Sequence, residues 1–363
     1  MPIRPKKALL NSDLMRPSAL DSRPRSQEML WLDKNENLDR ELLAVATEVL
    51  SSIPSIALTT YPDAGELYRK LGEWVGVNPE SLLLTPGSDG AIRLVFDAFV
   101  EKDDSVVHLR PTFAMYEVYS QMFGAKTTQI DYYATKVGPR IDIDRILSVL
   151  AEKVPKLLCI ANPDSPTGSV LNADDLERIL ETCEKFDTIL LLDEAYHPFF
   201  DWTGVPWTKK SKNLIVVRTF AKAWGAAGLR IGYAVAHPDT AKLLHKLRPM
   251  YETSTLAIEF MTRMLDHEEA MKTSVRSINK SKIYFYEEMD KLGFPTLATE
   301  GNFCHVAFGE KSGVLHSKLK NHVLYRESFE HPCLVGFTRF SVAPKSVMTQ
   351  VVEFIRNALE DIE

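Results

Sequence analysis

The chain has 363 residues, of which 45% are hydrophobic and 25% are charged, and its formal net charge is −6. This length allows one large core and a smaller second domain, and the composition is typical of a globular protein. A nucleic-acid-binding domain would be strongly basic, so the net charge argues against that class. No apolar run approaches the ~18–20 residues that a membrane-spanning helix needs.

The first 30 residues are rich in proline, arginine and serine and show no hydrophobic period. We interpret them as an N-terminal arm that is disordered alone or ordered only against a partner. Their apolar break, from position 8 to 10, is too short for the core of a signal peptide. The four cysteines lack the paired spacing of a metal or redox motif. We therefore expect a cytoplasmic protein with reduced thiols and no metal site.

A strand within residues 31–39 and a helix over 41–50 follow the arm, and the pattern then alternates. The expected elements in chain order are helix 65–75, strand 81–84, helix 91–99, strand 105–109, helix 113–123, strand 156–160, helix 172–183, and strands 188–192, 214–217 and 231–236. Fully apolar strands that alternate with helices predict an α/β fold with a mostly parallel sheet and helices on both faces. Ligands of such sheets bind beyond the carboxyl ends of the strands.

Residues 57–265 would form this large domain, whose last part is largely helical. Helices are expected over 240–247, 257–265 and 281–292, strands over 303–308 and 336–342, and a last helix over 347–362. We assign residues 31–56 and 266–363 to a smaller α+β domain, and residues 1–30 to the arm.

Residues 218–233 read RTFAKAWGAAGLRIGY and stand between two apolar strands. Lys222 lies between Ala221 and Ala223 and beside Trp224, an apolar setting that disfavours the ammonium form. A partly neutral lysine is a nucleophile that forms a Schiff base with a carbonyl. A lone lysine is more often a solvated surface charge, so this assignment depends on what the other loops supply.

Two stretches indicate a phosphate site. Gly87, Ser88 and Asp89 lie in a turn between a strand and a helix, where backbone N–H groups and the helix dipole favour an anion. Glycine turns before helices are also common without a ligand. Thr219 follows the strand that leads to the lysine, and Arg230 would add a charge-assisted hydrogen bond to a phosphate.

Other strand ends carry groups suited to a pyridine ring. Asp193 follows an apolar strand, and a carboxylate there would keep a pyridine nitrogen protonated and make the ring an electron sink. Tyr196 and Asn162 are placed to hydrogen-bond a phenolate oxygen, and Phe113 to stack on the ring. Each of these residues also has an explanation without a ligand. Asp193 suits a helix N-cap, Asn162 suits a tight turn, and Phe113 suits a position in the core.

Asn162, Asp193, Tyr196, Lys222 and Arg230 occur in this order at strand ends, and together they resemble the fold-type I pyridoxal-phosphate enzymes of the aspartate aminotransferase superfamily. From about residue 31 to the C-terminus the chain is similar to the histidinol-phosphate aminotransferase family. The stretches that carry this similarity are WLDKNENLD, YPD, TPGSDGAI, RPTFAMY, NPDSPTG, DEAY, RTFAKAWGAAGLRIGY and GFTRFSV.

The resemblance implies pyridoxal 5'-phosphate as the cofactor and a seven-stranded central sheet. It makes Lys222 the Schiff-base lysine and the carrier of the transferred proton, with Asp193 and Tyr196 as its catalytic partners. The resemblance also implies, residue by residue, the contacts with the cofactor phosphate and ring that are described above. The resemblance also implies a homodimer in which Tyr61 reaches the cofactor phosphate from the other subunit.

Three residues are expected to bind the substrate. Arg339 in FTRFSV matches the arginine that holds the α-carboxylate in the superfamily, and its planar fork suits a carboxylate. Arg326 lies 13 positions earlier, the spacing at which the histidinol-phosphate family carries a second substrate arginine. A solvated charge beside Glu327 is the alternative for Arg326. Asn35, in WLDKNENLD, is the third expected contact.

Three positions depart from the family pattern. Ala221 stands where a serine usually bonds the cofactor phosphate, and such a bond contributes on the order of 1.5–3 kcal/mol. Gly90 replaces a residue that is commonly acidic. A count back from WLDKNENLD places Ser18, after Pro17, where an aromatic residue usually contacts the substrate phosphate. The last departure puts histidinol phosphate itself in question.

The sequence thus predicts an aminotransferase that moves an amino group between an amino acid or amino phosphate, of the histidinol phosphate type, and 2-oxoglutarate. A decarboxylase of the same fold, resembling threonine-phosphate decarboxylases, is the alternative. A nicotinamide-dependent enzyme is disfavoured because no G-x-G-x-x-G follows the first strand of a βαβ unit. A non-catalytic regulator is disfavoured because the chain has no basic DNA-binding domain.

Overall fold

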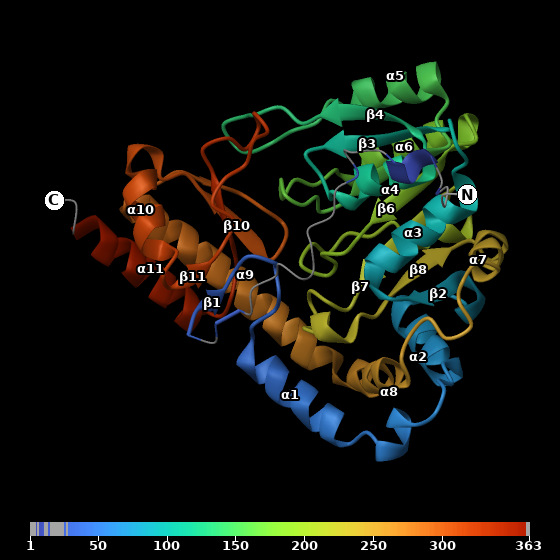
Figure 1. The fold of residues 1–363 in the computed structure, drawn as a ribbon, viewed down its shortest axis with the longest axis horizontal. Coiled ribbons are helices and arrows are strands. Elements are labelled where there is room, and N and C mark those ends of the chain that lie inside the picture. Colours follow the sequence, from blue (N-terminus) through green and yellow to red (C-terminus); the bar gives the residue numbers. More distant parts are fainter. Residues whose placement is uncertain (1–4, 6, 11–13, 15–24, 27, 361–363) are drawn as a thin grey trace.

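The computed structural model describes residues 5, 7–10, 14, 25–26 and 28–360. The central sheet and its helices lie on the right in Figure 1, and the C-terminal helices with a smaller sheet lie on the left. The long helix α9 (Glu268–Lys291) runs between these two parts. Ser18 and most of the N-terminal arm lie outside the described residues, and the described part of the arm includes the 3-10 helix η1 (Lys7–Leu10).

Seven strands form the central sheet, in the order β2-β8-β7-β6-β5-β3-β4. Their bounds are β2 Leu82–Thr85, β3 Ser105–Arg110, β4 Lys126–Asp131, β5 Leu157–Ala161, β6 Ile189–Asp193, β7 Leu214–Thr219 and β8 Gly232–Ala236. Neighbouring strands run parallel, except that β8 is antiparallel to both β2 and β7. The mostly parallel, seven-stranded sheet expected from the sequence is therefore confirmed.

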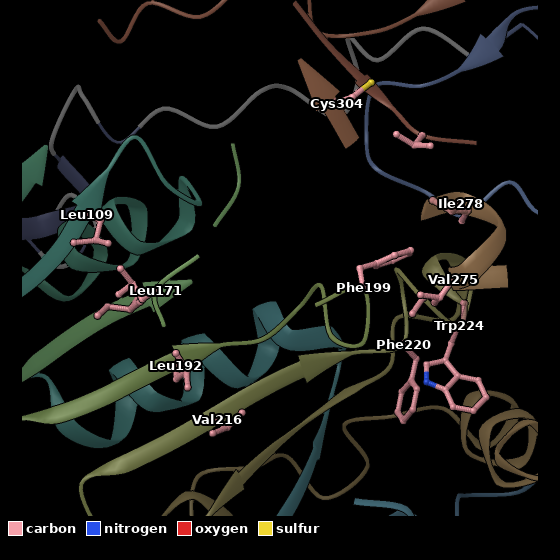
Figure 2. Close-up of a cluster of buried hydrophobic side chains, with 14 of the residues drawn as sticks. Leu109, Leu171, Leu192, Phe199, Val216, Phe220, Trp224, Val275, Ile278 and Cys304 are labelled. Carbon is pink, nitrogen blue, oxygen red and sulfur yellow. The ribbon is translucent and has the colours of Figure 1, made fainter. Parts of the chain in front are cut away.

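Helices cover both faces of this sheet. They are α2 Gly65–Val75, α3 Gly87–Phe99, α4 Met115–Phe123, α5 Ile143–Lys153, α6 Ala173–Lys185, α7 Pro238–His245 and α8 Thr255–Met264. Successive residues of a strand point to opposite faces. Leu191 of β6 accordingly packs in a buried cluster with α3 and α4, whereas Leu190 and Leu192 pack in a second cluster with α5 and α6. Figure 2 shows part of the second cluster, which extends to Val275 and Ile278 of α9.

A smaller antiparallel sheet has the order β12-β10-β9. Its strands are β9 Thr296–Leu297, β10 Phe303–Val306 and β12 Thr338–Ser341. β1 (Leu30–Trp31) pairs in parallel with β11 (Val323–Leu324), which joins the start of the described main body to its C-terminal part. The helices of this part are α1 Arg40–Ser51, α9, α10 Ser312–Leu319 and α11 Lys345–Glu360. The remaining short 3-10 helices of the described chain are η2 Ser55–Leu58, η3 Pro79–Ser81, η4 Val205–Lys209, η5 Ala227–Leu229, η6 Leu265–His267 and η7 Gly309–Lys311.

Some elements differ from the sequence prediction. The sequence prediction lacks the strand β4, because this edge strand, KTTQID, has only one buried residue and therefore no apolar run. α5 is also absent, although it has a helical apolar period and an N-cap, Asp142. The helix expected over 281–292 begins earlier, at Glu268. The sequence signal for its first half is weak, because that half buries little more than one side chain per turn. Among the described residues, no helix is both long enough and apolar enough to span a bilayer.

Candidate active site

A cavity of about 1020 Å³ opens where the strands β3, β5, β6 and β7 end. The last residue of each of these strands lines it, and so do residues 33–35, Arg326 and residues 328–332. The predicted site residues that line the cavity are Asn35, Ser88, Asp89, Phe113, Asp193, Tyr196, Thr219, Lys222, Arg230, Arg326 and Arg339. Gly87, Asn162 and Tyr61 are the predicted site residues that do not. The fold thus brings most of the predicted residues to one place.

Lys222 follows strand β7 and reaches into this cavity. Its Nζ donates a hydrogen bond of 2.7 Å to the carbonyl oxygen of Lys34 and lies 5.9 Å from the centre of the Tyr196 ring. Burial, together with the positive charges of Arg339 and Arg230, lowers the pKa of Lys222 to about 8. Part of the population is therefore a neutral amine near physiological pH, which is the nucleophilic form.

Asp193 is the last residue of β6 and is 4% exposed. The hydroxyl of Tyr116 donates to Oδ2 over 3.0 Å, and the backbone N–H of Ala195 donates to Oδ1 over 2.9 Å. Burial raises the pKa of Asp193 to about 7, against the lowering effect of these two hydrogen bonds. A carboxyl group with this pKa can share a proton with a basic ring nitrogen.

Tyr116 is a site residue that the sequence analysis missed. It lies in the first turn of α4, three residues after Phe113, and the two rings make an edge-to-face contact at 5.7 Å. Tyr116 therefore connects the expected stacking residue to the Asp193 carboxylate. The signal in the sequence is the i, i+3 spacing within RPTFAMY, which places both rings on one side of the first helical turn.

The first turn of α3 lines the expected phosphate site. The helix begins at Gly87, four residues before the predicted start, and its N-cap Pro86 makes no side-chain cap hydrogen bond. Such a helix start leaves backbone N–H groups for an anion. Gly87 has a φ of 75°, and a Cβ there would come within 2.8 Å of Nη2 of Arg230. At Gly90, a Cβ would come within 2.8 Å of Cδ of Pro86, which explains why no acidic side chain stands there.

Arg230 supplies a cation to this site, and Thr219 supplies a hydroxyl group. The Arg230 guanidinium contacts the backbone carbonyls of Ala227 and Pro86, both at 3.5 Å, and pairs with no carboxylate among the described residues. The Thr219 hydroxyl accepts a hydrogen bond from the backbone N–H of Ala221. Ala221 itself lines the cavity, so its lack of a hydroxyl falls where a phosphate ligand would be within reach.

Asn162 is placed differently from the expectation that its side chain faces the ligand. Its Oδ1 accepts the N–H of Leu171 over 2.8 Å, and its Nδ2 donates to the carbonyl of the same residue over 3.3 Å. It is 1% exposed and does not line the cavity. Its amide ties together the loop after β5, and one hydrogen of the Nδ2 group is left for a ligand.

Arg326 and Arg339 stand directly opposite each other in an antiparallel bridge and exchange both backbone hydrogen bonds, of 3.0 and 2.8 Å. Residues paired in this way project their side chains to the same side. The Arg339 guanidinium donates to the carbonyl of Asp33 over 2.8 Å, while its buried Nε has no hydrogen-bond partner. The Arg326 guanidinium lies 4.6 Å from the Phe329 ring centre. Neither arginine pairs with a carboxylate within the described part of the chain.

Tyr61 lies on the surface, outside the cavity. It is 78% exposed and stacks on Tyr251 with a ring distance of 4.4 Å. Ile56, Leu58 and Met250, from the same two segments, are each more than 60% exposed. A group of large apolar side chains in this state is typical of an interaction surface.

Comparisons with known proteins identify the family. The model of the family "Aminotransferase class I and II" matches residues 27–355. The histidinol-phosphate aminotransferase of Thermoanaerobacter pseudethanolicus is 31% identical over 337 residues, which are 91% of this chain and 92% of that protein. The corresponding protein of Clostridium novyi is 26% identical over 351 residues, with 95% and 97% covered.

Solved structures show the same fold. A putative histidinol-phosphate aminotransferase from Erwinia carotovora atroseptica has a TM-score of 0.81 at 23% identity, covering 94% of this chain and 99% of that one. The Sinorhizobium meliloti histidinol-phosphate aminotransferase in complex with pyridoxal-5'-phosphate has a TM-score of 0.79 at 21% identity, with 92% of each chain covered. An L-threonine-O-3-phosphate decarboxylase from Porphyromonas gingivalis has a TM-score of 0.73 at 22% identity, covering 92% of this chain and 100% of that one.

The chain belongs to the aminotransferase class I and II family. It is a pyridoxal-phosphate-dependent aminotransferase of fold type I, and it resembles the histidinol-phosphate aminotransferases within that family. The enzyme class and the cofactor expected from the sequence are thereby confirmed.

The residues around the cavity fit pyridoxal 5'-phosphate. At Gly87 and Gly232 a Cβ would meet Arg230 at 2.8 Å and the N–H nitrogen of Ser88 at 2.7 Å, so these glycines let the helix start, β8 and the arginine converge on a space for an anion. The buried Asp193 suits a protonated ring nitrogen, and Lys222 suits an aldehyde carbon. Each functional group of the cofactor therefore has a counterpart of the right chemistry.

Proposed function

We propose that this enzyme transfers an amino group from a phosphorylated amine of the histidinol phosphate type, whose anionic group is its phosphate, to 2-oxoglutarate. The observation that carries this proposal is the bridge between Arg326 and Arg339, two arginines that line the cavity without a carboxylate partner among the described residues. Like charges directly opposite in a sheet are destabilising. An anionic substrate would relieve this repulsion.

The two arginines suit both substrates of the reaction. The planar fork of Arg339 would hold a carboxylate, and its unpartnered Nε is a donor available for that bond. A donor of the histidinol phosphate type has no carboxylate, so both arginines would contact its phosphate. In 2-oxoglutarate, Arg339 would hold the α-carboxylate and Arg326 the distal carboxylate. The names of the relatives in Thermoanaerobacter pseudethanolicus and Clostridium novyi point to histidinol phosphate as the donor to test first.

We assign the cofactor-binding roles from the geometry of the cavity. The first turn of α3 (Gly87, Ser88 and Asp89), Thr219 and Arg230 would surround the phosphate. Phe113 would stack on the ring. Tyr196 and the remaining N–H of Asn162 would donate to the phenolate oxygen.

The bound cofactor supplies an electron sink for the negative charge that develops when the donor loses its α-proton. The Asp193 carboxylate would hold a proton on the ring nitrogen, and the hydrogen bond from Tyr116 favours its ionised form and fixes its orientation. Lys222 would accept the α-proton at Nζ and hold it for return, because its amine is partly neutral near pH 8. Arg339 would bind the anionic group of the donor in the cavity that Lys222 also lines, and would thereby orient the donor toward Nζ of Lys222.

We further propose that the active unit is a cytoplasmic homodimer. The exposed apolar side chains around Tyr61 and Tyr251 would form part of the subunit contact, and Tyr61 would reach the phosphate site of the partner subunit. Within a subunit, residues 57–265 would form the large domain, and residues 31–56 and 266–363 the smaller one. The long helix α9 would connect the two domains.

A panel of amino donors tests this function in single half-reactions scored by formation of pyridoxamine 5'-phosphate. We expect a phosphorylated amine such as histidinol phosphate to react faster than L-alanine, and 2-oxoglutarate to regenerate the starting enzyme. A Lys222→Ala variant is the control and should form none. Equal rates for donors with and without a phosphate would contradict the proposal.

The second candidate is a decarboxylase for a phosphorylated amino acid, supported by the fold shared with the Porphyromonas gingivalis enzyme. The same panel separates the two reactions when O-phospho-L-threonine is included and carbon dioxide is measured. Carbon dioxide release without pyridoxamine 5'-phosphate would favour the decarboxylase. The reverse result would exclude it.

A further inference from the structure

Residues 33–35 contact three of the site side chains at once. The carbonyl of Lys34 accepts the Nζ hydrogen bond of Lys222, and the carbonyl of Asp33 accepts one from Arg339. The third contact is made by a side chain, because Nδ2 of Asn35 donates to the hydroxyl of Tyr196 over 2.8 Å. This short segment, far from the other residues in sequence, therefore lies at the centre of the site.

The Asn35 side chain is fixed from several directions. Its backbone N–H donates to Oγ of Ser341 over 2.7 Å, and the same hydroxyl donates to Oδ1 of Asn35 over 3.1 Å. The Nδ2 group of Asn302 donates to the Asn35 carbonyl over 3.0 Å. Asn35 is 2% exposed, and its φ of 55° lies in the left-handed region, which asparagine tolerates better than most residues. Such a side chain is held ready to orient a neighbour rather than to follow a ligand.

The contact with Asn35 has a consequence for the direction of the Tyr196 proton. A tyrosine hydroxyl has one hydrogen and accepts through its lone pairs. Because the hydroxyl accepts from Asn35, its own hydrogen points elsewhere, and Tyr196 lines the cavity. Burial raises the pKa of Tyr196, although Arg339, Ser165 and Asn35 act to lower it, so the phenol keeps this hydrogen at neutral pH.

We propose that Asn35 is a positioning residue that holds the Tyr196 hydroxyl so that its hydrogen faces the phenolate oxygen of the cofactor. This inference rests on the role proposed above for Tyr196. It gives Asn35 a different task from direct contact with the substrate, which the sequence comparison implied. Ser341 and Asn302 then act on Tyr196 through Asn35, and they connect the smaller sheet to the cofactor.

The test measures the pH at which the absorption of the bound cofactor changes, in the holoenzyme without donor. A hydrogen bond from Tyr196 makes the phenolate oxygen less basic, so losing the bond raises this apparent pKa. We expect a rise of about one unit in Tyr196→Phe, from the energy of a hydrogen bond to a charged group. We expect a rise of about half a unit in Asn35→Ala, where the tyrosine remains but is no longer held.

A double variant provides the decisive comparison. Residues that act through one another are not additive, so Asn35→Ala combined with Tyr196→Phe should show the same apparent pKa as Tyr196→Phe alone. Asn35→Asp preserves the shape and the acceptor for Ser341 but loses the N–H donor, and it should shift the apparent pKa at least as far as Asn35→Ala. Melting temperatures of the apo-proteins and the Kd for added pyridoxal 5'-phosphate check that each variant folds and binds.

The possible results separate this inference from the proposed function. Additive shifts, or an Asn35→Ala variant with an unchanged apparent pKa and a raised KM for the donor, would overturn the positioning role in favour of direct substrate contact. An unchanged apparent pKa in Tyr196→Phe would overturn both the positioning role and the assignment of Tyr196. Donor-dependent formation of pyridoxamine 5'-phosphate by the unmodified enzyme reports on the proposed function independently of these variants.

Discussion

Gly87 and Arg230 approach each other so closely that a single added methyl group would collide with the guanidinium. A Cβ at position 87 would lie 2.8 Å from Nη2, 3.4 Å from Cζ and 3.5 Å from Nη1 of Arg230. Gly87 also has a φ of 75°, in the left-handed region. The start of α3 and the arginine can therefore face one phosphate only because position 87 has no side chain.

We predict that Gly87→Ala weakens the binding of pyridoxal 5'-phosphate at least tenfold. The left-handed backbone alone costs an L-residue about 1–2 kcal/mol, and Arg230 must also move away. Titration of the apo-protein with the cofactor, followed by absorbance, measures the effect. Gly228→Ala is the matched control, because a Cβ there meets no atom within 4 Å. A similar Kd in both variants would contradict this account.

We predict that Ala221→Ser tightens cofactor binding about tenfold. Ala221 lines the cavity and is 8% exposed, and a hydroxyl there would add one hydrogen bond to a charged group, a contribution of about 1.5–3 kcal/mol. The rate at which the holoenzyme loses its cofactor on dilution measures the effect and should fall. An unchanged rate, with an unchanged melting temperature of the apo-protein, would show that position 221 does not reach the phosphate.

We predict that covalent attachment of pyridoxal 5'-phosphate to the apo-protein has a pH midpoint of about 8. Burial and the charges of Arg339 and Arg230 lower the pKa of Lys222 to this value. The neutral, reactive amine therefore accumulates above pH 8, whereas an ordinary lysine would need a pH near its unperturbed value of 10.5. Attachment rates from pH 6 to 10, after trapping with cyanoborohydride, give the midpoint.

Variants of the two arginines that we propose to bind substrate provide controls for the same titration. Removing the positive charge in Arg339→Gln should raise the midpoint, because Arg339 is the main charge that lowers the Lys222 pKa. The shift should be partial, since burial is the larger cause. Arg326→Gln should leave the midpoint in place. A midpoint that is insensitive to Arg339 would contradict the electrostatic explanation.

We predict that Arg326→Gln lowers kcat/KM about 10- to 100-fold for a phosphorylated donor such as histidinol phosphate and leaves that of L-alanine nearly unchanged. The expected loss corresponds to one charge-assisted hydrogen bond, about 1.5–3 kcal/mol. Arg339→Gln should lower the value for both donors, because Arg339 would contact the α-carboxylate of L-alanine and the phosphate of the phosphorylated donor alike. Equal losses for the two donors in Arg326→Gln would show that Arg326 does not discriminate between them.

The sequence alone determined the large sheet and the gathering of most site residues. Apolar strands bury both faces, so β5, β6 and β7 are continuous hydrophobic runs that are readable without a structure. Parallel strands end at a common edge, so the groups that follow them must come together. Position along the chain was therefore enough to place Asp193, Lys222 and Phe113 in one cavity.

Contacts between distant segments were decided only by the tertiary structure. The sequence places Arg326 and Arg339 13 positions apart, but only the antiparallel bridge makes them opposite neighbours. The Tyr116 hydroxyl and the Asn35 amide reach Asp193 and Tyr196 across 77 and 161 positions. The sequence likewise predicts Asn162 as a ligand contact, and only the structure shows that its amide also bonds Leu171. A hydrogen bond needs its donor and acceptor to be placed within a few tenths of an ångström and at a favourable angle. The hydrophobic period of a sequence carries no information about positions at that precision.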